Sequence, residues 1–243
     1  MRRFGLIGYP LSHSFSKKYF TEKFQREGLS DHQYDLFPIE SIEGLKQVLA
    51  DHPDLVGINV TIPYKEQVLS FLDERNEIVQ EIGACNCIHR VDGKLKGYNT
   101  DVLGFIQTWE KKLNPSHKKA LVLGTGGAAK AVHYACRQKG ISYLEVSRTK
   151  RPGTITYADL DDAVMKEYTA IINTTPVGMY PEVDQCPELP YESIGADHYL
   201  YDLVYNPSET LFLKKGAERG AAIENGADML VIQAEASFAI WNS

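Results

Sequence analysis

Short apolar runs alternate with segments of helical periodicity through the first hundred residues. Phe20 and Phe24 stand four residues apart, as they would on one face of a helix. A second apolar stripe at helical spacing runs through residues 42–49. Compact apolar runs around these segments predict strands at residues 3–8, 34–37 and 55–60. The order strand, helix, strand, helix, strand predicts a parallel α/β architecture.

The pattern changes near residue 90. Asp92 and Gly93 lie between two apolar runs, an arrangement typical of a β-hairpin turn. Asp101 can begin a helix, in which Val102 and Ile106 share an apolar face. The first unit is therefore expected to contain a hairpin as well as parallel strands.

A second alternating unit follows the polar segment 114–119, which we interpret as a linker. Its strands are predicted at residues 120–123, 142–146, 170–173, 199–204 and 222–224. This repeating order is typical of a doubly wound sheet. The apolar residues of the last segment, from Ala227 to Trp241, predict a helix that packs back onto the first lobe.

Composition narrows the possible function classes. The 243 residues suffice for one large or two ordinary domains, and 43% hydrophobic with 24% charged residues is typical of a globular protein. A net charge of −6 provides no positive field for nucleic acid or anionic membranes. No apolar run approaches the ~18 residues that span a bilayer. We therefore expect small-molecule partners, no nucleic-acid or membrane partner, and a cytoplasmic location.

The four cysteines are irregularly spaced, which favours reduced thiols over a disulfide framework. Cys85 and Cys87 are two residues apart, but no second Cys or His pair at zinc-site spacing accompanies them. No metal site is predicted.

A glycine-rich segment follows the predicted strand at residues 120–123. Gly124, Gly126 and Gly127 precede a plausible helix, and Ala129 takes the place of the third glycine of a dinucleotide-binding loop. Glycines allow the backbone to turn tightly and approach a pyrophosphate, whose charge is stabilised by the amides of the helix N-terminus. A tight strand-to-helix turn without a ligand is the alternative, and the flanking elements favour the nucleotide.

The choice of cofactor is expected to depend on residues about twenty positions further on. Glu145 falls inside a predicted strand, whereas Arg148, Lys150 and Arg151 lie on the loop beyond it. Three cations at this place favour the 2′-phosphate of NADP, although they could also form only a solvated loop.

Two residues of the first lobe, Lys65 and Asp101, could move a proton during hydride transfer. Lys65 lies just past the carboxyl end of a predicted strand, where open α/β sheets bind their ligands. Taken alone, Lys65 would be a surface lysine and Asp101 a helix N-cap.

Nine segments of the chain, in order, resemble those of the shikimate dehydrogenase family. They are GYPLSHSFS at residues 8–16, NVTIPYK at 59–65, GACN at 83–86, GYNTD at 97–101, GTGGA at 124–128, SRT at 147–149, NTTPVGM at 173–179, DLVYNP at 202–207 and NGADMLVIQA at 225–234. The resemblance runs nearly from end to end.

This resemblance implies an NADP(H)-dependent oxidoreductase that interconverts 3-dehydroshikimate and shikimate in aromatic amino-acid biosynthesis, active as a monomer or homodimer. It implies a two-lobed α/β fold. An N-terminal substrate-binding domain would comprise residues 1–101 and 226–243, and a Rossmann-like NADP-binding domain residues 102–225.

The resemblance also implies the site residues. Lys65 would exchange the proton of the reacting oxygen, while Asp101 holds the hydroxyl and the ammonium in register. Ser14 and Ser16 would bind the substrate carboxylate, with Tyr205 nearby. The implied readers of the ring hydroxyls are Asn59, Thr61, Asn86 and Gln233. The implied cofactor-binding residues are Gly124, Thr125, Gly126, Gly127, Ala128, Ser147, Arg148, Thr149, Thr174, Leu203 and Gly226.

The chain departs from the family pattern at three places. Lys17 stands where the family usually has Pro, and Ser147 replaces a common Asn. The segment from residue 150 to 168 looks shortened, with little room for the usual helix. A quinate or dual quinate/shikimate dehydrogenase, or a catalytically silent ligand-sensing module of the same fold, are the alternatives. Retention of both Lys65 and Asp101 favours an enzyme.

Overall fold

The computed structural model describes residues 1–11 and 14–243. Ser12 and His13, which belong to the first of the nine segments, lie outside the described residues. The described chain divides into two compact units, residues 1–100 with 232–243 and residues 101–231. The sequence-based division at residue 226 differs from this one, because Met229 packs in the core of the second unit and its carbonyl approaches Gly104.

The first unit contains one mixed sheet with the strand order β2-β1-β3-β5-β6-β4 among its described residues. Its strands are β1 (Arg2–Gly8), β2 (His32–Pro38), β3 (Leu55–Val60), β4 (Glu74–Arg75), β5 (Cys87–Val91) and β6 (Lys94–Tyr98). Its helical segments are α1 (Phe15–Arg26), α2 (Gly44–Asp51), η1 (Gln67–Phe71) and α3 (Glu77–Ile82). The predicted helices at Phe20 and at residues 42–49 are confirmed.

The first sheet is parallel only in part. β1 pairs in parallel with β2 and β3, as predicted, but β5 runs antiparallel to both β3 and β6. The predicted hairpin accounts for the antiparallel pairing of β5 with β6. Asp92 and Gly93 connect β5 to β6 with φ of 50° and 77°, the left-handed conformation that the favoured two-residue hairpin turn requires.

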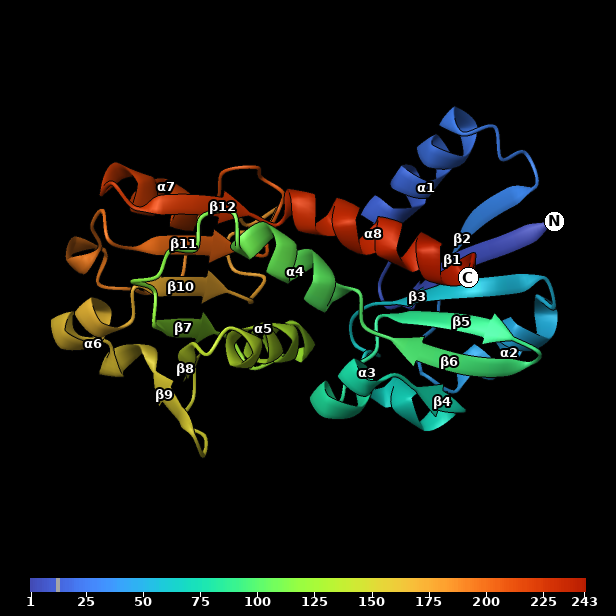
Figure 1. Cartoon of the computed structure of the whole chain (residues 1–243), viewed down its shortest axis with the longest axis horizontal. Coiled ribbons are helices and arrows are strands. Elements are labelled where there is room, and N and C mark those ends of the chain that lie inside the picture. The colour runs from blue at the N-terminus through green and yellow to red at the C-terminus, as the bar shows by residue number, and fades with distance from the viewer. Residues whose placement is uncertain (12–13) are drawn as a thin grey trace. The chain divides into compact units, whose positions relative to one another are not determined.

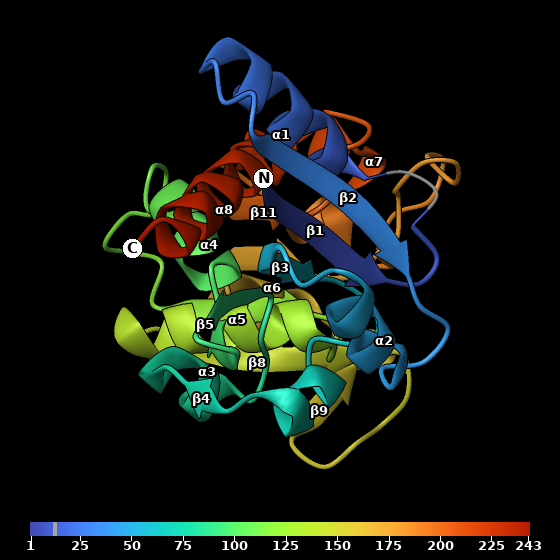
Figure 2. The ribbon, with the colours of Figure 1, turned by 90° about the vertical axis from the view of Figure 1, so that its right-hand side faces the viewer.

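Each face of the first sheet is covered by helices. Leu45 of α2, Val68 of η1 and Val79 of α3 pack on one face. The other face carries α1 and the end of α8 (Ala227–Trp241), as Figure 2 shows. Phe20 of α1 and Trp241 of α8 pack there with residues of the strands. The prediction that the final helix packs onto the first lobe is confirmed for residues 232–243.

The second unit contains a parallel sheet with the order β12-β11-β10-β7-β8-β9 among its described residues (Figure 1). Its strands are β7 (Lys119–Leu123), β8 (Ser142–Ser147), β9 (Thr154–Thr156), β10 (Ala170–Asn173), β11 (Tyr199–Asp202) and β12 (Ala222–Asn225). Its helical segments are α4 (Asp101–Trp109), α5 (Gly127–Gln138), η2 (Tyr157–Asp159), α6 (Asp162–Glu167), η3 (Tyr191–Ser193), α7 (Leu211–Glu218) and the first part of α8 (Ala227–Trp241). In this order the direction of winding reverses between β7 and β10, so the predicted doubly wound sheet is confirmed.

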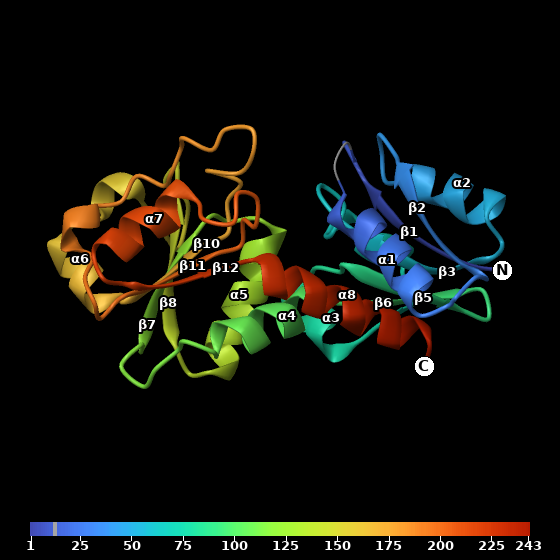
Figure 3. The ribbon, with the colours of Figure 1, turned by 90° about the horizontal axis from the view of Figure 1, so that it is seen from above.

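Successive residues of β7 alternate between the two faces of this sheet. Ala120 and Val122 pack on the side of α5, while Leu121 and Leu123 pack on the side of α7. Figure 3 shows α5 and α7 on opposite sides of the strands. Because both faces are covered, the central strands β7, β10 and β11 are apolar at most positions.

The segment from residue 150 to 168 contains β9, η2 and α6, a helix of only six residues. So short a helix is consistent with the expected lack of room for the usual one, whereas β9 and η2 were not predicted. Asp161 caps α6 by accepting a hydrogen bond from the amide of Val164 at 2.9 Å. The polar segment 114–119 lies inside the second unit, between α4 and β7.

All four cysteines lie in the described part of the chain, and no disulfide joins them. Cys85 and Cys87 are fully buried. No helix in residues 1–11 and 14–243 combines the length and the apolar character that a membrane span requires.

Trp241 joins the end of the chain to the first sheet. Its indole Nε1 donates to the carbonyl of Ile88 at 2.9 Å, and its ring lies against Gly57, where a Cβ would come within 2.3 Å of the indole. A glycine at residue 57 is therefore required for this contact. The Trp241 ring also stacks on Phe4, with centroids 5.1 Å apart.

We expect Trp241→Ala to lower the free energy of unfolding by about 3–5 kcal/mol, because it removes a fully buried aromatic ring. Urea denaturation followed by circular dichroism would measure this. Val231→Ala is the control, since Val231 lies on the same helix but is 39% exposed and its truncation should cost about 0.5 kcal/mol or less. Equal losses in both variants would contradict the packing argument.

Candidate active site

The predicted site residues lie mostly in loops that follow the carboxyl ends of parallel strands. In the first unit these are the segments after β1 and β3, and in the second unit the segments after β7, β8, β10 and β11. Ligands of open α/β sheets bind at this edge. Each unit therefore presents its candidate residues where the topology favours a binding site.

Ser14 and Ser16 flank the start of α1. Ser14 is the N-cap, and its hydroxyl oxygen accepts a hydrogen bond from the amide of Lys17 at 3.2 Å. Its hydroxyl hydrogen remains a donor. Ser16 lies in the first turn, where its hydroxyl contacts the phenol of Tyr34. Both serines are half-buried, so the first turn of α1 presents compact neutral donors.

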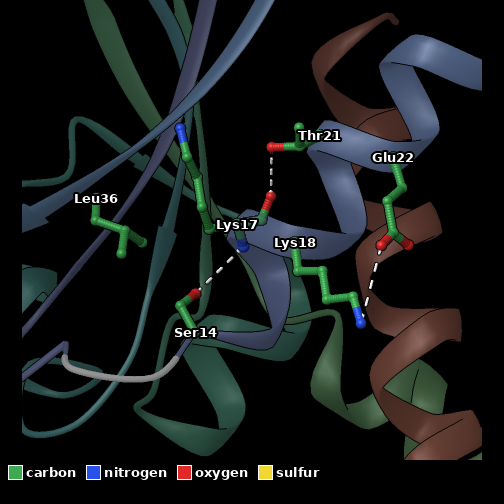
Figure 4. A pocket seen from close by; sticks show the side chains of 6 residues that line it. All are labelled: Ser14, Lys17, Lys18, Thr21, Glu22 and Leu36. Carbon is green, nitrogen blue, oxygen red and sulfur yellow. Dashed lines mark hydrogen bonds and ion pairs between the residues drawn. The ribbon is translucent and has the colours of Figure 1, made fainter.

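A pocket of about 320 Å³ lies beside Ser14 along α1 (Figure 4). Lys17, which replaces the family's usual Pro, borders it. The Lys17 ammonium donates to the carbonyl of Tyr34 and lies 3.3 Å from Asp35 Oδ1. The side chain thus ties the helix to β2, and the substitution leaves α1 beginning at Phe15.

The turn that carries Lys65 is fixed at three points. The amide of Thr61 donates to Ile7 O at 3.0 Å, and the amide of Cys85 donates to Lys65 O at 2.8 Å. Between them, the buried phenol of Tyr64 donates to the carbonyl of residue 39 at 2.6 Å. The backbone beneath the Lys65 ammonium is therefore held by parts of the chain outside the turn.

A buried network contains Asn59, one of the predicted hydroxyl readers. Asn59 is 4% exposed, accepts from the phenol of Tyr34 at 2.8 Å, and donates to Asn86 O at 3.3 Å and Ser237 Oγ at 3.1 Å. Burial raises the pKa of Tyr34, so its phenol remains a donor. Both amide hydrogens of Asn59 are thus engaged within the chain, and the remaining capacity for a ligand is on its oxygen.

The same network orients Asn86. Asn86 Oδ1 accepts from the amide of Thr100 at 2.7 Å, and Nδ2 donates to Thr100 Oγ1 at 3.0 Å. Thr100 Oγ1 in turn lies 3.1 Å from Ser237 Oγ, which donates to Gln233 O at 2.9 Å. Asn59, Asn86 and Gln233, which we predicted separately, are connected through two residues that we did not predict.

Sequence reasoning missed Tyr34, Thr100 and Ser237. Thr100 lies inside the segment GYNTD at residues 97–101, but its residue type alone does not indicate that it bonds to Asn86. Ser237 is one polar residue in a largely apolar helix, and its partner Thr100 is 137 residues away in the chain. No local signal could have found that pair.

Asp101 is the first residue of α4, so its carboxylate lies in the first turn, where the helix dipole favours an anion. Taken alone, Asp101 is interpreted as a helix N-cap. Because α4 begins at Asp101 itself, Thr100 takes the N-cap position instead. The hydrogen bonds from Thr100 to Asn86 fix the backbone just before Asp101.

The glycine-rich loop has the geometry of a nucleotide-binding turn. Gly124 has φ of +106°, and a Cβ there would come within 2.8 Å of Thr174 Oγ1. Gly126 precedes the first turn of α5, which begins at Gly127. Ala129 is fully buried in the core shared with β7 and β10, so a small residue is required where the helix approaches the sheet. The amides at the N-terminus of α5 suit an anionic group.

The loop after β8 carries exposed cations close to this turn. Ser147 is buried and its hydroxyl accepts from the amide of Thr149 at 3.4 Å. Arg148 and Arg151 are exposed, and the guanidinium of Arg151 donates to Thr125 Oγ1 at 3.1 Å. A cation of this loop is thus held against the glycine-rich loop itself.

Glu145 has a different partner. It lies inside β8, as predicted, with Oε1 3.6 Å from His133 Nε2 of α5. Burial lowers the pKa of His133 to about 4, so the imidazole is neutral near pH 7. Burial also raises the pKa of Glu145. The carboxylate of Glu145 therefore faces α5, and the residues that follow the end of β8 are Arg148 and its neighbours.

The remaining predicted cofactor residues lie on adjoining loops of the second unit. Thr174 donates to Leu123 O through its amide at 2.9 Å and its hydroxyl at 2.7 Å. A Cβ at Gly226 would come within 2.2 Å of Leu203 O, so these two residues touch. Tyr205 follows β11 and is half-buried, and burial raises its pKa.

Comparisons with known proteins agree on one family. A model described as the shikimate dehydrogenase substrate binding domain matches residues 6–88. A curated relative from Desulforamulus reducens, named shikimate dehydrogenase (NADP(+)), is 36% identical over 98% of this chain and 88% of its own.

Two solved structures are similar to the whole chain. Shikimate 5-dehydrogenase from Thermus thermophilus, in complex with NADP(H) and shikimate, has a TM-score of 0.87 at 31% identity, covering 99% of this chain and 93% of that one. The Listeria monocytogenes protein, in complex with shikimate and NAD, has a TM-score of 0.88 at 26% identity, covering 100% and 92%. With sequence identity sustained over nearly its full length, the chain belongs to the shikimate dehydrogenase family.

Proposed function

We propose that this chain catalyses the reversible NADPH-dependent reduction of 3-dehydroshikimate to shikimate, an early step of aromatic amino-acid biosynthesis, with Lys65 and Asp101 acting on the reacting oxygen. The observation that carries the function is the identity of 36% with an NADP-linked shikimate dehydrogenase over 98% of the chain. The chain is an oxidoreductase of this family, and it takes small-molecule ligands.

Lys65 is proposed as the group that exchanges the proton. In reduction, an ammonium stabilises the alkoxide that develops on the substrate oxygen and then protonates it. Asp101 is proposed to accept a hydrogen bond from the same hydroxyl and to keep the ammonium in register. The three hydrogen bonds that fix the turn below Lys65 support this role, because a proton donor must be held within hydrogen-bond reach.

Ser14 and Ser16 are proposed to bind the substrate carboxylate, with Tyr205 nearby. Thr61, Asn86 and Gln233 are proposed as readers of the ring hydroxyls, since these side chains can donate or accept. Asn59 is proposed to join them through its oxygen only. The network from Tyr34 to Ser237 supports the roles of Asn59 and Asn86, because it fixes which way these two amides point.

The second unit fits a dinucleotide. The open space at Gly126, where a Cβ would meet nothing within 4 Å, the amides from Gly126 to Ala128, and the exposed Arg148 match a pyrophosphate and a 2′-phosphate. When bound, NADPH supplies the hydride. Thr125, Ser147, Thr149, Thr174, Leu203 and Gly226 are proposed to complete the cofactor site.

We infer a cytoplasmic enzyme that works as a monomer or homodimer and has no nucleic-acid or membrane partner. The net charge of −6 supports the lack of a polyanionic partner. The unit of residues 1–100 and 232–243 is proposed to bind the substrate, and the unit of residues 101–231 to bind NADP.

The activity itself can be measured by the near-ultraviolet absorbance of the reduced cofactor. Purified protein should reduce NADP with shikimate, and turn over more slowly with quinate or with NAD. Turnover with quinate alone, or no turnover with any of the four pairs, would contradict the proposal.

Lys65→Ala should lower kcat by about 10²-fold or more with little change in KM, because it removes the proton-transfer group and leaves the binding residues. Steady-state kinetics with shikimate and NADP would measure the split. Lys94→Ala, at an exposed lysine of the β5–β6 hairpin, is the matched control and should retain normal turnover. Near-normal turnover of Lys65→Ala would remove Lys65 from the mechanism.

Arg148→Ala should raise KM for NADP about tenfold while changing KM for NAD little, because a guanidinium contributes mainly to the 2′-phosphate. Arg219→Ala, at an exposed arginine of the same unit, serves as control for the loss of one charge. If both cofactors are affected equally, Arg148 does not read the phosphate.

A further inference from the structure

Asp202 lies at the carboxyl end of β11 and is fully buried. Its carboxylate accepts three hydrogen bonds, from Thr210 Oγ1 at 2.6 Å, Asn173 Nδ2 at 2.9 Å and the amide of Val204 at 3.0 Å. All three donors are neutral. Burial raises the pKa of Asp202 to about 6, so the group is ionised at pH 8. A buried carboxylate with no cationic partner among these donors has a high desolvation cost and calls for an explanation.

The donor Asn173 links Asp202 to the loop after β10. Because Asn173 Nδ2 donates to Asp202, its Oδ1 points the other way and accepts from Thr175, through the amide at 3.0 Å and the hydroxyl at 2.6 Å. Thr175 and Thr174 lie against Gly124, where a Cβ would come within 2.9 Å of Thr175 Cγ2. Asp202 therefore acts through one amide on the wall of the glycine-rich loop.

The backbone amide of Val204, another of the three donors, links Asp202 to the loop after β11. Leu203 N donates to Asn173 O at 3.0 Å, and Leu203 O lies against Gly226. The side chain of Asp202 and the backbone of residue 173 thus hold residues 203 and 204 from both directions.

The remaining donor, Thr210, links the carboxylate of Asp202 to helix α7. Thr210 is fully buried and is the N-cap of α7, where its oxygen also accepts from the amide of Leu213 at 3.4 Å. One carboxylate oxygen is used by the helix cap, and the other is shared by the two loops. Because its two oxygens bond to different parts of the chain, the carboxylate cannot rotate with one loop without losing its other hydrogen bonds.

We propose that Asp202 is a positioning residue that sets the loops at residues 174–177 and 203–205 for the bound dinucleotide, acting through Asn173 and the backbone of Val204 rather than by touching the cofactor. The proposal rests on the proposed function, because it takes these loops to face NADP.

Binding of NADPH to the intact protein, followed by its fluorescence at pH 8, tests the proposal directly. Asp202→Asn retains an acceptor for Asn173 and Val204 and can donate to Thr210, so its Kd should stay within about threefold of the wild type. Asp202→Leu keeps the branched shape of the side chain, with two larger methyl groups in place of the oxygens, but has no acceptor, and should raise Kd at least about tenfold. KM for NADP should rise in parallel, with a smaller change in KM for shikimate.

A second variant covers the case in which Asp202→Leu does not fold. Thr175→Val removes a half-buried hydroxyl that donates to Asn173 Oδ1 and accepts from the amide of Val177, and should raise Kd for NADPH several-fold. Met165→Ala is the control for lost stability. Met165 is fully buried in the same unit, but its carbonyl contacts His198 at the amino end of β11, away from the loops. It should lower the melting temperature and leave Kd unchanged.

The outcomes separate this inference from the proposed function. Normal NADPH binding by both Asp202→Leu and Thr175→Val overturns the positioning role, as does an Asp202→Asn variant as weak as Asp202→Leu. A wild-type protein that binds NADPH but does not oxidise shikimate overturns the proposed function and leaves the comparison of variants valid. A wild-type protein that does not bind NADPH overturns both.

Discussion

Buried amide and carboxyl side chains fix the loops that carry the candidate site, at the edge of each sheet where the carboxyl ends of its parallel strands lie. Asn59 and Asn86 do so in the first unit, and Asn173 and Asp202 in the second. An unpaired polar group in these positions would cost about 1–3 kcal/mol, so only loop conformations that keep the hydrogen bonds are stable. Burying a polar residue usually costs free energy. At these positions the same cost fixes the orientation of each side chain, because only one orientation keeps its hydrogen bonds.

The two units apply this constraint in different ways. In the first unit, side chains bond mainly to other side chains, so that an amide, a hydroxyl and a phenol determine each other's direction. In the second unit, a single carboxylate bonds to a backbone amide, a side-chain amide and a helix cap. A small polar ring needs hydroxyl and amide donors in fixed directions, whereas a dinucleotide needs a backbone that comes close to its phosphates.

The sequence predicts the framework of this protein well and its supporting contacts poorly. Apolar runs and the Asp92–Gly93 turn were sufficient for the strands around the site, because their signals are local. β9 was missed because it has only three residues, and α6 because six residues are too few for a clear period. Ser237 and Asp202 were not predicted as site residues, since their roles depend on partners that only the folded chain brings near. Resemblance to a family supplied the roles of Lys65 and Asp101, which residue type alone would not have given.

The first unit is assembled from two segments that flank the second unit in the chain, since residues 232–243 belong with residues 1–100. During synthesis, the ribosome releases residues 232–243 only after the whole second unit has been made. Until then Phe4, Phe20 and Tyr34 lack the indole that covers them in the finished protein. The first unit, although its larger segment is translated first, is thus completed only after the second unit, and the part of its sheet that Trp241 covers stays exposed until then.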